Sequence, residues 1–365
     1  MNYIFSILLK DFSFYVNIYV TGYVTRKKEI IMTYTIKDVA QKANVSTATV
    51  SRILNDQGGY SEKTKRKVLN VIQELDYYPS GVARGLTNKR TDTIGVLVPN
   101  LTSSLITEFL NGIESVAHKI GSSVIVCHTE SHGVKTLKYL QLLHEKRIDG
   151  LILASTALKK EYYDYIVKMR VPVVLLSAYS EFPVPYVTAD DYEAAYTGTK
   201  YLIQKGHKNI GMISGNKEEW IAGNLIPRVE GFKRALSDHN IPFNESYIEY
   251  GKFSIDDGVT GLKILLNRVP DLTAIFAEND EIGMGVLSAA YNLGIKVPEK
   301  LSVIGMDDIS LCKFMSPPLT SVSLSHNEMA EKAANLMFKM INSDTEVNNC
   351  ILDHQIIERK SVRSQ

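Results

Sequence analysis

Four side chains that can contact nucleic acid lie within six residues of one another: Thr47, Ala48, Ser51 and Arg52. At the spacing of an α-helix they share its outer face, while Val50, Ile53 and Leu54 face inward. A guanidinium pairs well with guanine in the major groove of DNA, and hydroxyl and methyl groups can contact other base edges. This pattern is typical of a helix that enters the major groove.

The residues before this helix predict how it is positioned. Thr35 can cap a preceding helix, with Asp38 returning a hydrogen bond to the helix start. Asn44 and Val45 suit a tight turn, and Ser46 caps the second helix. Two helices joined in this way form a helix-turn-helix, although short helix pairs also occur as packing elements of all-α domains.

The charge distribution favours the DNA-binding alternative. A third helix, capped by Ser61, starts with four basic residues at positions 63 and 65–67. Between Thr33 and Thr91 there are ten Lys and Arg residues against five Asp and Glu, whereas the whole chain has a net charge of only +1. A locally basic module on a nearly neutral protein is suited to contact with phosphates.

Within this module two kinds of DNA contact are expected. Side chains that reach base edges should determine sequence preference, and we assign this role to Thr47, Ala48 and Arg52. Hydroxyl groups nearer the helix start should touch phosphates, and we assign this role to Ser46, Thr49 and Ser51.

Four longer segments resemble a known family: TIKDVAQKANVSTATVSRILN, ELDYYPSGVARGL, IGMDD and IERKSV. In this order they are similar to the LacI/GalR family of bacterial transcription regulators, from about Thr33 to Val362. The resemblance implies a helix-turn-helix DNA-binding domain at residues 33–78, a hinge at 79–91, and an effector-binding and dimerisation domain at 92–362. It also implies a repressor more than an activator.

Beyond Thr91, apolar strands alternate with helices as far as the segment LSVIGMD. This alternation predicts an α/β architecture with parallel sheets covered on both faces. A break near residues 180–190 divides the pattern into two doubly wound subdomains. Ligands of such sheets bind beyond the carboxyl ends of the strands, where the two subdomains would face each other.

The family resemblance implies a periplasmic-binding-protein-like core that closes on a small effector, usually a sugar. Four residues match effector-contacting positions of that family: Arg228, Phe253, Asn279 and Asp307. Amides, carboxylates and guanidinium groups bind sugar hydroxyls, and an aromatic ring covers the apolar face of a sugar. The ordinary alternatives are a surface arginine, a core phenylalanine and a capping aspartate.

The chain also departs from the family pattern. The segment PNLTSSLITEF lacks the aromatic pair that often follows the first strand, whereas the segment before Arg228 is longer and holds the only tryptophan, Trp220. That indole could stack on a ligand or fix its own loop. The effector is therefore expected to be a sugar or sugar phosphate of unspecified identity.

The segment SGVARGLT carries a further expectation from the resemblance. Glycines interrupt its helical spacing, so it should fold only when held against DNA. Ala83, Arg84 and Leu86 are expected to contact DNA, with Leu86 inserted between base pairs in the minor groove. The plain alternative is a flexible linker. Because the chain lacks a terminal apolar heptad repeat, a homodimer on a near-palindromic operator is expected.

The first thirty-one residues are apolar and aromatic, interrupted by Lys10 and Asp11. They could form a membrane anchor, or they could precede the true start at Met32, which stands just ahead of the helix-turn-helix motif as in the family. We favour the second interpretation, in which residues 1–31 are an extension outside the native protein. N-terminal sequencing of the native protein distinguishes the two.

The remaining motifs argue against catalysis and cofactors. No phosphate-binding or nucleophile motif is present, and His128 and His132 follow a strand rather than lying on a helical metal-binding face. Three widely spaced cysteines favour a reducing compartment, hence the cytoplasm. We therefore expect a regulator with no cofactor, no metal and no membrane partner. The alternatives are a sugar-binding transport receptor and a membrane-tethered regulator.

Overall fold

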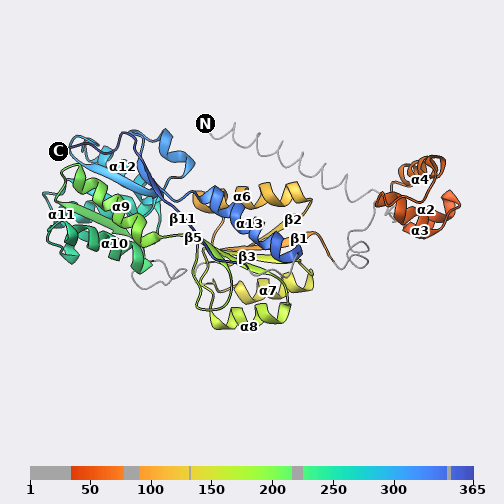
Figure 1. Cartoon of the computed structure of the whole chain (residues 1–365). Coiled ribbons are helices and arrows are strands. Elements are labelled where there is room, and N and C mark those ends of the chain that lie inside the picture. Colours follow the sequence, from red (N-terminus) through yellow and green to blue (C-terminus); the bar gives the residue numbers. More distant parts are fainter. Residues whose placement is uncertain (1–33, 78–89, 131–132, 216–224, 343–346) are drawn as a thin grey trace, which may run out of the picture. The chain divides into compact units, whose positions relative to one another are not determined.

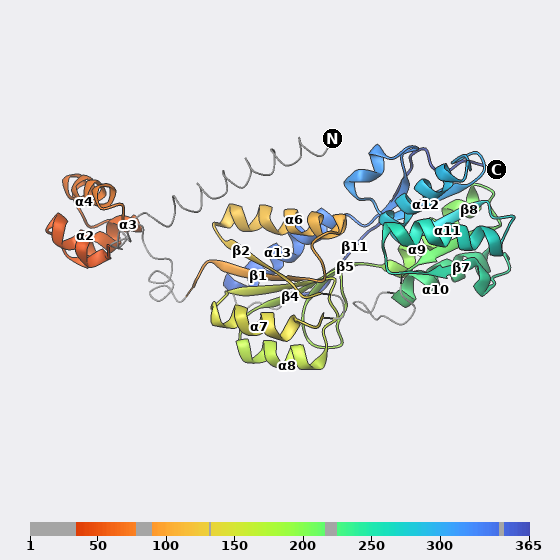
Figure 2. The same ribbon diagram turned by 180° about the vertical axis from the view of Figure 1, so that it is seen from behind.

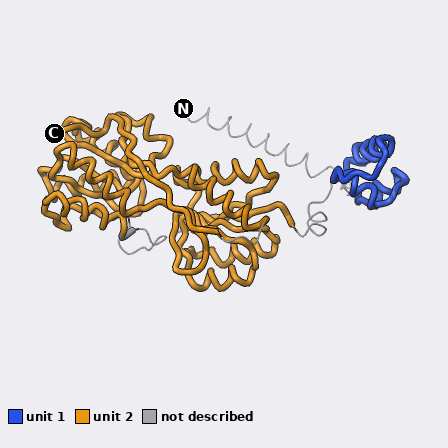
Figure 3. The backbone as a smooth tube through the Cα atoms, in the orientation of Figure 1, with its two compact units in different colours: residues 1–87 blue, residues 88–365 orange. Residues whose placement is uncertain are grey.

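The computed structural model describes residues 34–77, 90–130, 133–215, 225–342 and 347–365. The chain divides into two compact units, Met1–Thr87 and Asn88–Gln365 (Figure 3). Within the described residues, no helix combines the length and the apolar character needed to cross a bilayer.

The described residues of the first unit form three helices: α2 (Ile36–Ala43), α3 (Thr47–Leu54) and α4 (Glu62–Glu74). Their small core consists of buried aliphatic side chains: Val39, Ala40, Ala43, Val50, Ile53, Val68 and Val71. The capping predictions are confirmed, because the Ser46 and Ser61 hydroxyls accept hydrogen bonds from the backbone amides of Thr49 and Thr64. The Asp38 carboxylate accepts hydrogen bonds from the amide and the hydroxyl of Thr35, each 2.7 Å long.

The second unit contains two six-stranded sheets (Figures 1 and 2). The first sheet has the order β11-β5-β4-β3-β1-β2 and is wholly parallel. Its strands are β1 (Thr93–Val98), β2 (Ser123–His128), β3 (Gly150–Ala154), β4 (Val173–Leu176), β5 (Tyr186–Ala189) and β11 (Cys350–Leu352). We call this sheet and its helices the first lobe. The helices are α6 (Ser104–Ile120), α7 (Thr136–Glu145), α8 (Lys160–Met169) and α13 (His326–Asn342).

The second sheet has the order β12-β10-β9-β8-β6-β7, with only the β10–β12 pair antiparallel. Its strands are β6 (Ile210–Ser214), β7 (Ile248–Tyr250), β8 (Ala274–Ala277), β9 (Ser302–Asp307), β10 (Thr320–Ser323) and β12 (Gln355–Ile357). The second lobe consists of this sheet and its helices, together with the short 3₁₀ segments Glu245–Tyr247 and Ser310–Phe314. The helices are α9 (Asp191–Gln204), α10 (Leu225–Asp238), α11 (Ile255–Arg268) and α12 (Asp280–Asn292).

Helices cover both faces of each sheet, as the alternating pattern predicts. In the first lobe α6 and α13 pack on one face and α7 and α8 on the other (Figure 1). In the second lobe α9 and α10 pack together on one face, and α11 and α12 on the other. The fold class is therefore confirmed: parallel-dominated α/β lobes preceded by a helix-turn-helix.

The connectivity differs from the simple division into two consecutive halves. The strand alternation was expected to end with β9, but β10, α13, β11 and β12 follow it. The chain passes to the second sheet after β5, returns to the first lobe as α13, and finally adds β11 and β12 to different sheets. Each lobe is thus completed by residues distant in sequence.

One close contact between helices gives a test of this packing. Gly285 on α12 lies against α11, and a methyl group at this position would stand 2.0 Å from the carbonyl oxygen of Ile255. Alanine ordinarily stabilises a helix by about 1 kcal/mol relative to glycine. Here we expect Gly285→Ala to lower the free energy of unfolding by about 1–3 kcal/mol, because the helices must separate. Urea unfolding beside Ser288→Ala, an exposed position on the same helix, tests this, and an unchanged or raised stability would contradict it.

Candidate DNA-binding surface and effector site

Helix α3 presents the residues that the sequence predicts to contact bases. Thr47, Ala48 and Arg52 are exposed, and Arg52 has no described ion pair. Val50 on the same helix is fully buried. The helix therefore could not turn Thr47, Ala48 and Arg52 inward without removing Val50 from the core. The structure therefore presents a methyl, a hydroxyl and a guanidinium on one surface.

The predicted phosphate-contacting residues are more constrained. The Ser46 hydroxyl caps α3 and lies 2.9 Å from the Thr49 hydroxyl, so both groups already have a partner. Thr49 and Ser51 are half-buried, and the Asn55 amide donates a long hydrogen bond to the Ser51 hydroxyl. The hinge residues Ala83, Arg84 and Leu86 lie outside the described residues. Residues 1–31 and Trp220 also lie outside them.

The effector candidates lie at the carboxyl ends of strands in the second lobe, as the strand-end rule predicts. Asp307 is the last residue of β9, and Phe253 and Asn279 follow β7 and β8. Arg228 reaches the same end of the sheet from α10, and its Nη2 lies 3.8 Å from Oδ1 of Asp307. The structure therefore brings Arg228 and Asp307 together.

The closest partner of Arg228 is a residue that the sequence did not indicate. This partner is Asp191: the Nε of Arg228 donates to Oδ1 of Asp191 at 2.6 Å. The Nη1 of Arg228 donates to the carbonyl oxygen of Glu278 at 2.8 Å. Asp191 is 3% exposed, and burial raises the pKa of its carboxyl group, although the Arg228 guanidinium opposes this. Burial alone would lower the pKa of Arg228, but the carboxylates of Asp191 and Asp307 raise it overall. Arg228 therefore stays charged.

Asp307 is held from the first lobe as well. Oδ1 of Asp307 lies 3.2 Å from Nε2 of His326, the first residue of α13. The imidazole is 2% exposed and packs edge-on against the Phe109 ring of α6, with ring centroids 5.2 Å apart. Asp307 also has a left-handed backbone with φ of 109°. Its position is thus fixed by contacts from both lobes.

Phe253 and Asn279 hold each other. The Asn279 side chain caps α12 by accepting a hydrogen bond from the Ile282 amide, and it donates to the carbonyl oxygen of Phe253 at 3.2 Å. The Phe253 ring packs directly over Gly215, where a methyl group would lie 2.0 Å from it. Asn279 thus has a capping role in this structure, and its effector contact stays a prediction.

Two further buried carboxyl groups border the cluster. Burial and the nearby Asp307 raise the pKa of Asp280 to about 8, although its oxygens accept hydrogen bonds from the Ser321 hydroxyl and the Ile309 amide. Glu278 is fully buried, and its Oε2 accepts hydrogen bonds from the Ser214 hydroxyl and the Gly215 amide. Burial also raises the pKa of Glu278. Asp191 closely follows β5 of the first sheet and Glu278 directly follows β8 of the second, so both carboxyl groups could have been inferred from strand ends.

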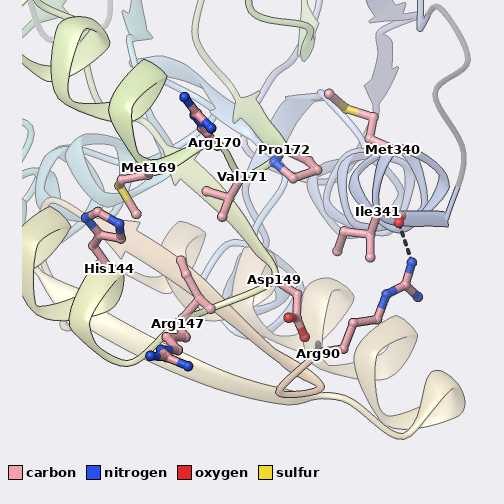
Figure 4. Close-up of a pocket in the computed structure, with 11 residues that line it drawn as sticks. Arg90, His144, Arg147, Asp149, Met169, Arg170, Val171, Pro172, Met340 and Ile341 are labelled. Carbon is pink, nitrogen blue, oxygen red and sulfur yellow. Dashed lines mark hydrogen bonds between the residues drawn. The ribbon is translucent and has the colours of Figure 1, made fainter. Parts of the chain in front are cut away.

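A separate cavity of about 540 Å³ lies in the first lobe, at the amino ends of β1, β3 and β4 (Figure 4). It is lined by charged and apolar side chains that include Arg90, Arg147, Asp149 and Arg170. Arg90 donates to Oδ1 of Asn342 at the end of α13, and Asp149 accepts from the Thr91 and Thr93 amides. The helices α7, α8 and α13 end here, and arginines suit helix C-termini, so we interpret these charges as structural. No group of three or more side chains suited to a metal ion occurs in the described parts of the chain.

Comparisons with known proteins agree with this arrangement. Residues 91–359 match the family described as periplasmic binding proteins and sugar binding domain of LacI family, and residues 35–80 match bacterial regulatory proteins of the lacI family. Catabolite control protein A of Priestia megaterium is 36% identical over 334 residues, which cover 91% of this chain and all of that protein. The transcriptional repressor PurR of Photobacterium profundum is 33% identical over 332 residues, covering 90% and 98%.

Two solved structures resemble most of this chain. The lac repressor dimer bound to operator and the anti-inducer ONPF superimposes with a TM-score of 0.81 at 26% identity, covering 90% of this chain and 99% of that one. The complex of the transcriptional regulator CelR with cellobiose gives a TM-score of 0.68 at 27% identity, with the same coverage. These homologues and structural neighbours are transcription regulators rather than enzymes.

Proposed function

This chain belongs to the LacI family of bacterial regulatory proteins, and on that premise we propose that a small carbohydrate, bound at the strand ends of the second lobe, controls its affinity for operator DNA. The chain is a DNA-binding transcriptional regulator. The observation that supports the effector site best is the buried group of Arg228, Asp191 and Asp307 at the carboxyl end of the second sheet.

The chemistry of this group suits a polyhydroxylated ligand. Carboxylates accept hydrogen bonds from hydroxyl groups, the guanidinium donates to ring or hydroxyl oxygens, and the half-buried Phe253 ring offers an apolar face. The cellobiose carried by the related CelR structure supports a carbohydrate as the ligand class. Arg228, Phe253, Asn279, Asp307 and Trp220 are our proposed effector contacts.

On the DNA side, we assign base contacts to Thr47, Ala48 and Arg52 and phosphate contacts to Ser46, Thr49 and Ser51. The exposed face of α3 supports the first assignment. We propose that residues 33–78 form the DNA-binding domain, residues 79–91 the hinge, and residues 92–362 the effector-binding and dimerisation domain. We also propose a homodimeric repressor that acts in the cytoplasm on a near-palindromic operator, as in the dimeric lac repressor complex with operator.

The proposal is tested by measuring how sugars change the binding of DNA. A preferred duplex is first selected from a random DNA library with the purified protein, and its binding is then measured with and without individual sugars. We expect a preferred near-palindromic site and at least one sugar that changes its affinity by about 5–150-fold, the range of ordinary allosteric coupling. Absence of any sequence preference at moderate salt would refute the regulator's proposed operator specificity.

The proposed minor-groove role of Leu86 is tested by Leu86→Ala. If its side chain inserts between base pairs, the variant loses the contact that stabilises a kinked operator, but it keeps its phosphate contacts. We expect operator affinity to fall by tenfold or more and affinity for random DNA to change less than twofold. Fluorescence anisotropy with both duplexes measures this, and an equal loss on both would eliminate the insertion.

A further inference from the structure

Glu278 borders the candidate effector site, although no effector role was expected for it. It follows β8 directly and is 0% exposed. Oε2 is saturated by the Ser214 hydroxyl and the Gly215 amide, whereas Oε1 is buried with no hydrogen-bond partner among the described residues. A buried carboxylate oxygen without a donor is costly, and such groups in native structures call for an explanation.

The surroundings of Glu278 connect this oxygen to the effector site. The carbonyl oxygen of Glu278 accepts a hydrogen bond from Arg228, and its carboxylate binds the amide of Gly215. Gly215 lies directly under the Phe253 ring. Glu278 therefore lies beside Arg228 and beneath the Gly215–Phe253 contact, at the same end of the second sheet.

Two groups that could receive an anion here, the Arg228 guanidinium and the amino end of α6, already bind carboxylates. Arg228 is paired with Asp191 and lies beside Asp307. At the amino end of α6 in the first lobe, the Ser104 amide donates to Oε1 of Glu281 at 3.0 Å. Within the described part of the chain, the site therefore offers more negative than positive charge.

We propose that the effector carries no negative charge, being a neutral or amine-bearing polyhydroxylated compound, and that Oε1 of Glu278 accepts a hydrogen bond from it. This inference rests on the proposed function and narrows its ligand class, because a phosphorylated sugar would bring a dianion against three buried carboxyl groups. A ligand hydroxyl or ammonium group supplies the donor that Oε1 lacks. The raised pKa of Glu278 agrees with this, since burial disfavours its charge until a donor arrives.

The first test asks whether Glu278 serves a ligand or the fold. Glu278→Gln keeps the shape and the acceptor for Ser214 and Gly215 while removing the charge. We expect the ligand-free variant to melt within about 2 °C of the parent or above it. Glu299→Gln, an exposed position, controls for the change in net charge. A fall of more than about 4 °C in Glu278→Gln alone would mean that the carboxylate is structural and would overturn its assignment.

The second test compares matched ligands by thermal shift and titration calorimetry. The panel contains glucose, glucosamine and glucose 6-phosphate, ribose and ribose 5-phosphate, and cellobiose and its 6-phosphate. We expect binding only among the neutral and amine-bearing members, with affinity at least tenfold weaker in Glu278→Gln than in Glu299→Gln. Binding confined to phosphorylated members would overturn the charge inference and leave the carbohydrate effector standing. Equal affinity in both variants would overturn the role of Glu278, and no binding by any member would refute the carbohydrate effector itself.

Discussion

Replacing Arg228 by alanine should lower the free energy of unfolding of the second unit, here called the effector-binding unit (Asn88–Gln365), by about 3–5 kcal/mol. The same change should abolish the response of the protein to effector. The Arg228 side chain is 12% exposed and its partner Asp191 only 4%. Without the guanidinium, the Asp191 carboxylate would be buried with no positive partner, and the carbonyl oxygen of Glu278 would lose its donor. The loss therefore includes both an ion pair and the cost of an isolated charge.

The matched control lies on the same helix. Arg234 also pairs with a carboxylate, Asp238, but its side chain is 61% exposed, and such surface pairs contribute about 0–1 kcal/mol. Urea unfolding of Arg228→Ala and Arg234→Ala, followed by effector titration, separates the two environments. Similar stabilities for the two variants would contradict the burial of the Arg228–Asp191 pair.

Val50→Asp is expected to unfold the DNA-binding unit and remove binding to every duplex while the effector-binding unit stays folded. Val50 is 0% exposed in a core of only a few aliphatic side chains. An ionised carboxylate there has no partner, and a domain this small has little stability to spare. DNA binding should therefore fall by at least a hundredfold for both operator and random sequences.

Leu69→Asp provides the control with the same added charge. Leu69 lies on α4 of the same unit and is 44% exposed, so its substitution should leave the core intact. Anisotropy titrations and the effector-induced thermal shift, measured on both variants, give the two readouts. Retained DNA binding by Val50→Asp would show that α3 does not pack as described.

The sequence predicted the elements whose signals are local. Ser46, Ser61 and Thr35 each mark a helix start through a hydrogen bond three residues away, and the structure contains all three. The strands β1 to β4 and β6 to β9 also follow from short apolar runs between helices, whereas β5 lies in the segment 180–190 that was expected to divide the two subdomains. The position of Asp307 at a strand end then followed from the general rule for parallel sheets.

Contacts between distant segments could not be predicted in this way. The pairing of Arg228 with Asp191 joins the starts of two neighbouring helices, and residue spacing gives no sign of it. His326 reaches Asp307 only because the chain returns to the first lobe after β10, a connection that hydrophobic alternation does not encode. The role proposed for Glu278 could not be identified from the sequence for a different reason. That its Oε1 has no hydrogen-bond partner among the described residues is known only when the positions of the surrounding groups are known.

Helix α13 runs from the candidate effector site to the start of the second unit. It runs for 17 residues, about 25 Å, from His326 to Asn342. At one end His326 contacts the carboxylate of Asp307, and at the other Asn342 accepts a hydrogen bond from Arg90, which stands at the start of the effector-binding unit. A ligand that displaces Asp307 would therefore act on one end of a helix whose other end holds Arg90, near the start of the second unit.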